Sequence, residues 1–160
     1  MLREIISGDA GFVRDLLNQP SFIKYIGDRG VRSVEQAAEF IDNRYRKSYL
    51  DHGFGLYTVE LKDGNRPIGI CGFVKRDTLP DPDLGFAFLP EYEGKGYGYE
   101  SASEIMKYGR SVLLLDRILA ITSLDNIASS HLLEKLGFKF DKLIGTPDTE
   151  VLKLYVSIPD

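Results

Sequence analysis

The chain has 160 residues, of which 43% are hydrophobic and 28% are charged, a balance typical of a folded domain of ordinary size. Its formal net charge is -4 and it contains no basic block, which argues against a general nucleic-acid-binding protein. No apolar run approaches the ~20 residues that cross a bilayer, and the single cysteine, Cys71, excludes an intrachain disulfide. The first residues lack the features of a signal peptide, so we expect no membrane partner and a cytoplasmic location.

The spacing of apolar and turn residues predicts a mixed α/β (α+β) fold. The expected elements are, in chain order, a strand over 2–6, a helix over 10–18, a loop through Pro20 and 27–30, a helix from Ser33 to Gly53, strands over 56–61, 67–74 and 84–89, a helix over 96–112, a strand over 117–122, a helix over 126–136, and strands over 138–144 and 151–158. Asp9 can cap the first helix, and Ser33 with Gln36 forms a capping box.

The order of these elements predicts how the strands pair. An Asp-Gly turn within residues 62–65 makes the three central strands an antiparallel meander. Two strands that are joined by a crossover helix usually pair in parallel. We therefore expect the strand over 84–89 to lie parallel to the strand over 117–122. We therefore predict a single domain over residues 1–160 with a mixed, mostly antiparallel central sheet and about four flanking helices.

Some side chains are assigned to the core or the surface by pattern alone. Cys71 lies inside a strand pattern and is expected to be a small core residue. His52 is expected in a loop, and His131 on a solvent-facing side of its helix. The helix over 96–112 is expected to turn a set of mostly small and apolar residues inward, namely Ala102, Ile105, Met106, Gly109, Val112 and Leu113.

Three glycines lie between a predicted strand and a predicted helix, in the sequence Glu-Gly-Lys-Gly-Tyr-Gly-Tyr over 93–99. Free N–H groups at a helix N-terminus, together with the helix dipole, favour an anion and most often a phosphate. The spacing matches neither the NTPase phosphate loop nor the dinucleotide fingerprint. The loop is thus either a phosphate site of another kind or only a tight entry into the helix.

A second group of polar residues begins the helix over 126–136. Asn126 lies at its N-terminus and Ser129 follows one turn later, so both side chains can point at one ligand. Asn126 also suits the role of N-cap, and it can serve in both ways.

Together these two groups resemble the GNAT superfamily of acyl-CoA-dependent N-acetyltransferases, most of all the branch with the ribosomal-protein N-terminal acetyltransferases. The first family signature, Q/R-x-x-G-x-G/A after a strand ending in proline, reads Glu-Gly-Lys-Gly-Tyr-Gly over 93–98 after Pro90. The second, N-x-x-S followed by L-x-K-x-G-F, is matched by Asn126, Ser129, Leu133, Lys135, Gly137 and Phe138. The order of elements also matches, so the resemblance spans essentially the whole chain.

The resemblance implies a binding site for acetyl-CoA as co-substrate, with no metal. The amides of 94–99 would bind the pyrophosphate, and the strand at 86–89 would hydrogen-bond the pantetheine arm, which requires the sheet to splay beside 117–122. Asn126 would contact the pantetheine arm or the phosphates, and Lys135 is either near phosphate or an exposed helix charge. The implied cofactor-binding residues are Phe86, Ala87, Phe88, Leu89, Glu93, Gly94, Lys95, Gly96, Tyr97, Gly98, Tyr99, Asn126, Ser129 and Lys135.

Two positions depart from the family pattern. Glu93 stands where the family usually has Gln or Arg, so weaker cofactor affinity is expected, which Lys95 can partly offset. Leu133 replaces the tyrosine that protonates the leaving thiolate in many members, and Ser129 is the candidate replacement. The amine must also lose a proton, and Asp83, which opens the strand toward the acetyl site, is the candidate base. A plain turn residue is the alternative for Asp83.

The expected activity is direct transfer of an acetyl group from acetyl-CoA to a primary amine, either a small molecule or a protein N-terminus. The alternatives are a non-catalytic acyl-CoA-binding or regulatory domain and a purely structural domain. The acceptor pocket would come from 22–54 and the last hairpin loop, and the acidic overall charge mildly favours a cationic acceptor. We expect no nucleic-acid partner and a monomer or homodimer.

Overall fold

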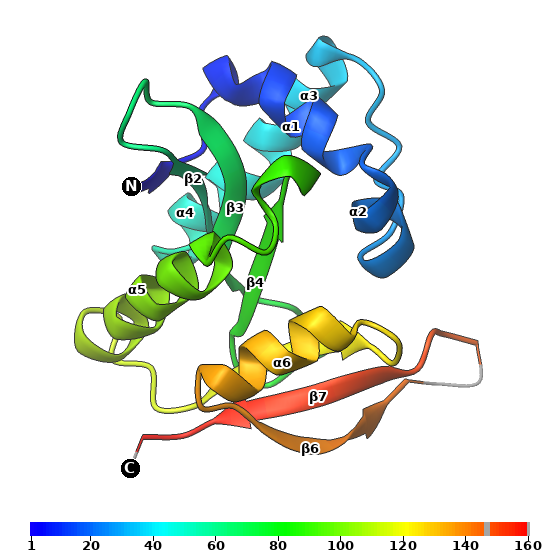
Figure 1. Ribbon diagram of the computed structural model, residues 1–160, viewed down its shortest axis with the longest axis vertical. Coiled ribbons are helices and arrows are strands. Elements are labelled where there is room, and N and C mark those ends of the chain that lie inside the picture. Colours follow the sequence, from blue (N-terminus) through cyan, green and yellow to red (C-terminus); the bar gives the residue numbers. More distant parts are fainter. Residues whose placement is uncertain (146–147, 160) are drawn as a thin grey trace.

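The computed structural model describes residues 1–145 and 148–159, which form one seven-stranded sheet with helices on both faces (Figure 1). The strands lie in the order β1 (Leu2–Glu4), β2 (Leu56–Glu60), β3 (Pro67–Val74), β4 (Asp83–Phe88), β5 (Ile118–Ser123), β7 (Leu152–Ser157) and β6 (Lys139–Ile144). Every neighbouring pair is antiparallel except β4 with β5, which is parallel. The predicted mixed, mostly antiparallel sheet is thereby confirmed.

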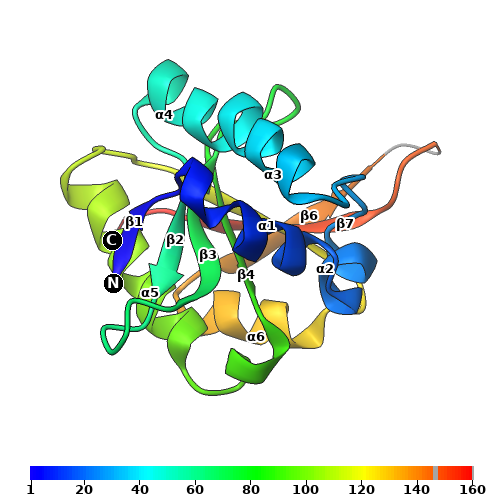
Figure 2. The same cartoon turned by 90° about the horizontal axis from the view of Figure 1, so that it is seen from above.

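The helices cover the sheet in two groups (Figure 2). Their bounds are α1 (Ala10–Leu17), α2 (Pro20–Tyr25), α3 (Val34–Phe40), α4 (Lys47–His52), α5 (Tyr97–Ser111) and α6 (Ile127–Lys135), with 3-10 turns at Ser7–Asp9 and Pro90–Tyr92. A π-helical stretch, Ile41–Arg46, joins α3 to α4 into one continuous helical segment. None of the helices within the described residues has the length and apolar character needed to cross a membrane.

The two larger apolar cores of the described residues lie on opposite faces of the sheet. On one face, α1 and the α3–α4 segment pack on Ile70 of β3 and Ala87 of β4. On the other, α5 and α6 pack on Phe73 of β3 and Phe86 of β4. Cys71 is 0% exposed, which confirms it as a core residue, and burial raises the pKa of its thiol to about 12.

The structure corrects three predictions in the N-terminal region. Pro20 begins α2 instead of lying in a loop, because proline suits the first helical position, where no N–H partner is needed. The Asp9 carboxylate does not cap α1; it accepts hydrogen bonds from the Ile6 N–H at 3.0 Å and from two nitrogens of Arg3 at 2.8 and 2.9 Å. His52 is the last residue of α4, not a loop residue.

Further along the chain the predictions hold more closely. Ser33 and Gln36 form the predicted capping box, with Gln36 N–H donating to Ser33 Oγ at 3.1 Å. The expected inward face of α5 is correct except at Val112, which follows the helix and is 62% exposed. The chain turns away there because α5 ends at Ser111.

Candidate active site

The sheet opens between β4 and β5. Within the described residues these strands share a single register pair, Asp83 with Leu119, where the Leu119 N–H also donates to the Pro82 carbonyl oxygen at 2.9 Å. Beyond this pair the edge of β4 that faces β5 has no strand partner, and residues 85–88 are only half-buried. The predicted splay of the sheet between these two strands is therefore present. It leaves backbone groups of β4 available to an extended ligand.

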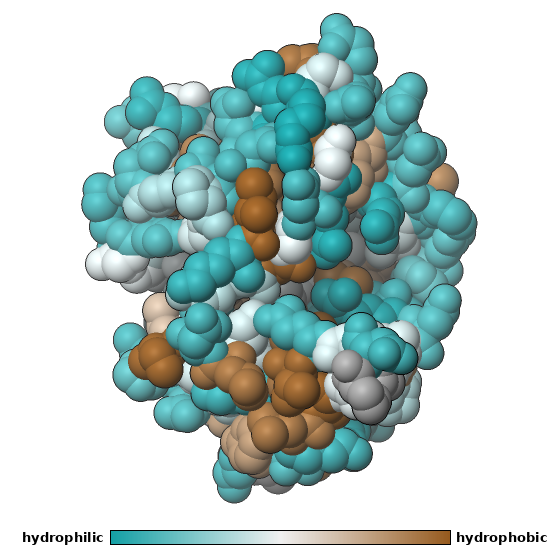
Figure 3. Space-filling model, turned by 90° about the vertical axis from the view of Figure 1, so that its right-hand side faces the viewer, coloured by the Kyte–Doolittle hydropathy of each residue, from teal (hydrophilic) through white to brown (hydrophobic). Residues whose placement is uncertain are grey.

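A continuous cleft of about 1210 Å³ occupies this opening and extends to the α2 and α3–α4 side of the molecule. Figure 3 shows the corresponding side of the surface, hollowed across its middle with hydrophobic residues on both rims. The volume slightly exceeds the ~300–1,000 Å³ of common small-molecule sites, which suits two substrates bound together.

The glycine loop forms one end of the cleft. Gly94 and Gly96 have φ angles of 70° and 87°, a left-handed conformation that disfavours other side chains. Glycine is favoured at the third position for a different reason. A Cβ on Gly98 would lie only 3.3 Å from the side chain of Leu132 in α6. The amides of residues 94–99 donate no hydrogen bond to a backbone or side-chain acceptor in the described part of the chain. Such a run at a helix N-terminus suits a phosphate.

Most of the predicted cofactor-binding residues lie on the cleft wall. These are Phe86, Ala87, Phe88, Glu93, Gly94, Gly96, Gly98, Tyr99, Asn126, Ser129 and Lys135. Three predicted residues do not line it. Leu89 packs into the core beside α1 and α3, Tyr97 packs 6.2 Å from the Tyr92 ring, and Lys95 Nζ lies 5.9 Å from that same ring. Only the backbone amides of Lys95 and Tyr97 remain as candidates for contact with a ligand.

Helix α6 closes the cleft opposite β4. Asn126 Oδ1 accepts a hydrogen bond from the Ser129 N–H at 3.2 Å. Asn126 is therefore the N-cap of α6, which confirms one of the two roles predicted for it. Among the described residues its amide group Nδ2 and the Ser129 hydroxyl have no further partner, which leaves both to a ligand. At the other end of α6, Lys135 Nζ lies 4.3 Å from the Tyr99 ring centre at the start of α5.

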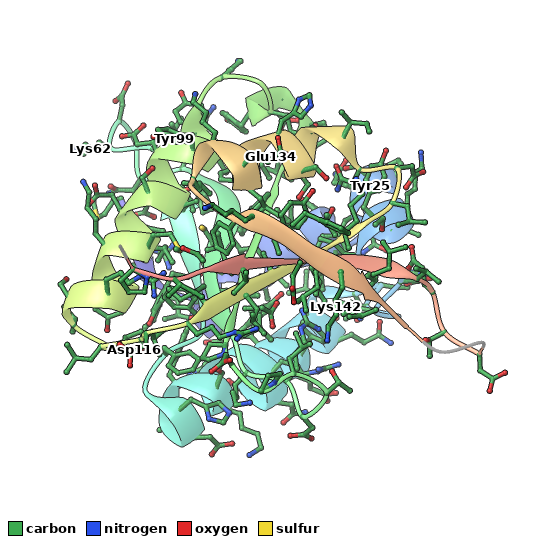
Figure 4. All side chains as sticks on the ribbon, turned by 90° about the horizontal axis from the view of Figure 1, so that it is seen from below. Tyr25, Lys62, Tyr99, Asp116, Glu134 and Lys142 are labelled. Atoms are coloured by element: carbon green, nitrogen blue, oxygen red, sulfur yellow. The ribbon has the colours of Figure 1, made fainter. Side chains whose placement is uncertain are left out.

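The two ends of α6 are thus held by different parts of the chain. Figure 4 places Tyr99 of α5 near one end of this helix and Tyr25 of α2 near the other. At that second end, the Ser123 hydroxyl donates to the Tyr25 carbonyl oxygen at 3.2 Å, and Lys24 lies 3.7 Å from Asp125. The glycine loop and the α2 region are therefore opposite ends of one cleft.

Asp83 lies at the point where β4 and β5 separate. It is 1% exposed, and Arg76 Nε donates to its Oδ1 at 2.9 Å. Burial raises the pKa of Asp83, and the positive charge of Arg76 opposes but does not cancel that rise. A carboxylate with a raised pKa in a cleft is suited to accept a proton. Arg76 was missed from the sequence, since nothing there relates it to Asp83.

Thr122 of β5 is another wall residue that sequence reasoning missed. Its hydroxyl is buried and has no hydrogen-bond partner among the residues described. An unpartnered buried hydroxyl usually costs about 1–3 kcal/mol, so a ligand atom is a natural partner for it. The only signal in the sequence is a pair of polar residues, Thr122 and Ser123, at the end of an apolar strand.

The other half of the cleft is built mainly by α2 and the α3–α4 segment, in agreement with the predicted contribution of 22–54. Its polar lining includes Tyr25, Arg29, Asn43, Arg44, Tyr45, Ser48 and His52. The predicted contribution of the last hairpin loop is represented by Glu150, while 146–147 lie outside the described residues. No group of His, Cys, Asp or Glu side chains in the described ranges is arranged to hold a metal ion.

Comparison with known proteins identifies the architecture. Residues 1–139 match the model of the acetyltransferase (GNAT) domain family. The chain is 29% identical over 163 residues to the uncharacterized N-acetyltransferase YoaA of Bacillus subtilis (strain 168), covering 96% of this chain and 92% of that protein. It is 26% identical over 141 residues to spermidine N(1)-acetyltransferase of Escherichia coli (strain K12), covering 88% and 73%.

A solved structure extends this comparison to the fold. RimL, described as a ribosomal L7/L12 alpha-N-protein acetyltransferase in complex with coenzyme A, superposes with a TM-score of 0.84 at 15% identity, covering 98% of this chain and 92% of RimL. At that identity the likeness concerns the fold alone.

Proposed function

The chain belongs to the acetyltransferase (GNAT) domain family and is an acyltransferase of the N-acetyltransferase type, and from this premise we propose that it moves an acetyl group from acetyl-CoA directly to a primary amine. The observation that carries the proposal is the opening of the sheet beyond the Asp83–Leu119 pair, with a loop of free amides at its end. A thioester on an extended arm fits such an opening, since the open edge of β4 offers strand-like hydrogen bonds.

The glycine loop and α6 are proposed to hold the co-substrate. The amides of 94–99 bind the pyrophosphate, and the β4 edge at 86–88 binds the pantetheine arm. Asn126 Nδ2 and the Thr122 hydroxyl face the same cleft and supply polar contacts to that arm. Glu93 also lines the cleft, so its carboxylate opposes phosphate binding, as its departure from the family pattern suggested.

The transfer step needs two proton movements. The acceptor nitrogen attacks the thioester carbonyl carbon, a C–N bond forms and the C–S bond breaks. Asp83 takes the proton that the nitrogen loses, and Ser129 gives a proton to the departing thiolate and is reprotonated from solvent. Backbone N–H groups along β4 polarise the carbonyl oxygen. Direct transfer requires no covalent enzyme intermediate, so no nucleophilic side chain is needed.

Release of the coenzyme A thiol with a panel of amines tests the proposal. We expect amine-dependent release by the wild type. Ser129→Ala should lower kcat by roughly 10- to 100-fold with little change in the KM for acetyl-CoA, because the group acts on the leaving thiolate. Ser103→Ala, on α5 and off the cleft wall, is the matched control. Binding of acetyl-CoA without thiol release from any amine would favour a non-catalytic domain and refute the proposal.

A further inference from the structure

The acceptor half of the cleft contains a convergence of arginines. Arg29 follows α2, Arg44 lies in the π-helical stretch and Arg76 follows β3, yet all three line the same cavity. Burial of its guanidinium, together with the charges of Arg44 and Arg76, lowers the pKa of Arg29. Three segments far apart in the sequence therefore bring like charges together at one place.

Two of these guanidinium groups, those of Arg29 and Arg44, are not neutralised by the protein, whereas that of Arg76 is paired with Asp83. In the described part of the chain Arg29 and Arg44 form no ion pair, and Arg44 lies over the Phe40 ring at 5.5 Å. Arg76 uses only Nε for Asp83, which leaves its two terminal nitrogens without a partner among the described residues. Lys75 Nζ, on the same wall, donates only to the carbonyl oxygens of Arg76 and Leu79.

The acidic groups on this wall do not balance the arginines. Asp51 is paired with Lys47, and Asp83 is the partner of Arg76. Asp125 faces Lys24 at 3.7 Å, and Glu150 accepts a hydrogen bond from the Ser123 hydroxyl at 3.2 Å. Unpaired positive charges placed together in a cleft repel one another unless an anion lies between them.

We propose that the acceptor amine carries its own anionic group, a carboxylate or a phosphate, which Arg29 and Arg44 bind while the amine is directed toward Asp83. Guanidinium groups bind carboxylates and phosphates through two parallel hydrogen bonds, which would fix the position of the amine. The inference rests on the acetyl transfer proposed above. The unpaired arginines give this half of the cleft a local charge opposite to the overall charge of -4, so the proposal departs from the mild preference for a cationic acceptor that the composition indicated.

Acceptors matched in pairs test the proposal by turnover. Glucosamine 6-phosphate is compared with glucosamine, and an α-amino acid with its methyl ester, while spermidine serves as the polycation. We expect kcat/KM to favour the anionic member by about 10- to 100-fold, the scale of a charge-assisted hydrogen bond. The two pairs separate phosphate from carboxylate. Equal or faster acetylation of glucosamine, the ester or spermidine would overturn the inference while leaving the acetyltransferase activity intact.

Variants connect that preference to the arginines. Arg29→Gln and Arg44→Gln should raise the KM of the anionic acceptor about tenfold or more, leave the KM of its neutral partner unchanged and leave acetyl-CoA binding unchanged. Arg46→Gln is the control, because Arg46 lies on the same helical segment, pairs with Asp42 at 3.0 Å and is off the cleft wall. An equal effect of Arg46→Gln, or no effect of the other two variants, would refute the assignment.

A second measurement does not depend on turnover. Protein saturated with coenzyme A is titrated with inorganic phosphate, so that the glycine loop is already filled. We expect phosphate to bind to the wild type and to Arg46→Gln, and at least about tenfold more weakly to the Arg29→Gln/Arg44→Gln double variant. Equal binding by the wild type and the double variant contradicts the proposal. Failure of the wild type to bind coenzyme A at all would instead refute the activity on which it rests.

Discussion

Arg76 Nε donates a hydrogen bond to Asp83 Oδ1 at 2.9 Å, directly where β4 and β5 part. Asp83 is 1% exposed, while the Arg76 side chain is 36% exposed, so a buried carboxylate is linked to solvent through its partner. Burial holds the pKa of Asp83 above its ordinary value, and Arg76 limits how far it rises. This pair can therefore set the pH range in which the acceptor amine loses its proton.

The first prediction concerns the pH dependence of catalysis. The base must be ionised, so kcat/KM should fall as pH drops through the pKa of Asp83. Arg76→Gln removes a charge that lowers this pKa, and the acidic limb of the profile should move to higher pH. Asp83→Asn should reduce kcat by roughly 10²- to 10⁴-fold. Arg117→Gln, on a residue 3.5 Å from Asp81 and off the cleft wall, should leave the limb in place. A limb unmoved in Arg76→Gln would argue against Asp83 as the base.

The second prediction concerns stability. The folded-state pKa of Asp83 is raised above the reference value of 3.8, so its contribution to stability is fully present below that value and is lost as pH rises through the folded pKa. Asparagine does not titrate. The unfolding free energy of Asp83→Asn relative to the wild type should therefore increase as pH rises from the reference value of 3.8 through the folded pKa of Asp83. Urea unfolding across this range provides the measurement, and a difference that stays constant or falls would contradict the raised pKa.

The third prediction separates charge from backbone strain in the glycine loop. Gly96 has a φ of 87°, which Asn and Asp tolerate better than other non-glycine residues. Gly96→Asp should weaken coenzyme A binding by on the order of tenfold or more, because it puts a negative charge where the amides meet the phosphates. Gly96→Asn, of nearly the same shape, should retain most of the affinity. Equal losses in both variants would mean that the loop conformation, and not phosphate charge, decides binding.

A fourth prediction follows from Glu93. Its side chain is exposed on the cleft wall beside the free amides, where its charge would repel a bound phosphate. Glu93→Gln should tighten coenzyme A binding by roughly two- to fivefold at low ionic strength, and the gain should shrink as salt screens the charge. Glu91→Gln, exposed in the neighbouring 3-10 turn and off the wall, should have a smaller effect. Weaker binding by Glu93→Gln would show that the carboxylate has a positive role.

The features that the sequence predicted well are local or periodic. The strand Pro67–Val74 follows from the Asp-Gly turn before it, and the capping box of Ser33 and Gln36 follows from cap chemistry within four residues. The glycine loop was identified because positive φ angles, such as that of Gly96, favour glycine, and a cluster of glycines is visible in the sequence. Pro20 was misread for an equally local reason, since proline favours both a loop and the first residue of a helix.

The features that the sequence did not predict depend on three-dimensional convergence. Arg29, Arg44 and Arg76 belong to three separate segments, and only the packing of these segments around the cleft makes them neighbours. The same holds for the unpartnered hydroxyl of Thr122, since its lack of an acceptor depends on the departure of β4 from β5. The π-helical stretch Ile41–Arg46 also has no counterpart in the 3.6-residue pattern from which the helix was predicted.

The central claim is that the opening between β4 and β5 holds acetyl-CoA. Titration calorimetry of the wild-type protein with acetyl-CoA, ATP and NAD tests it most directly, since all three carry the phosphates that a glycine loop can bind but only one carries a pantetheine arm. We predict one site for acetyl-CoA and at least about tenfold weaker binding of ATP and NAD. Equal affinity for the three ligands, or no binding of acetyl-CoA, would contradict the account.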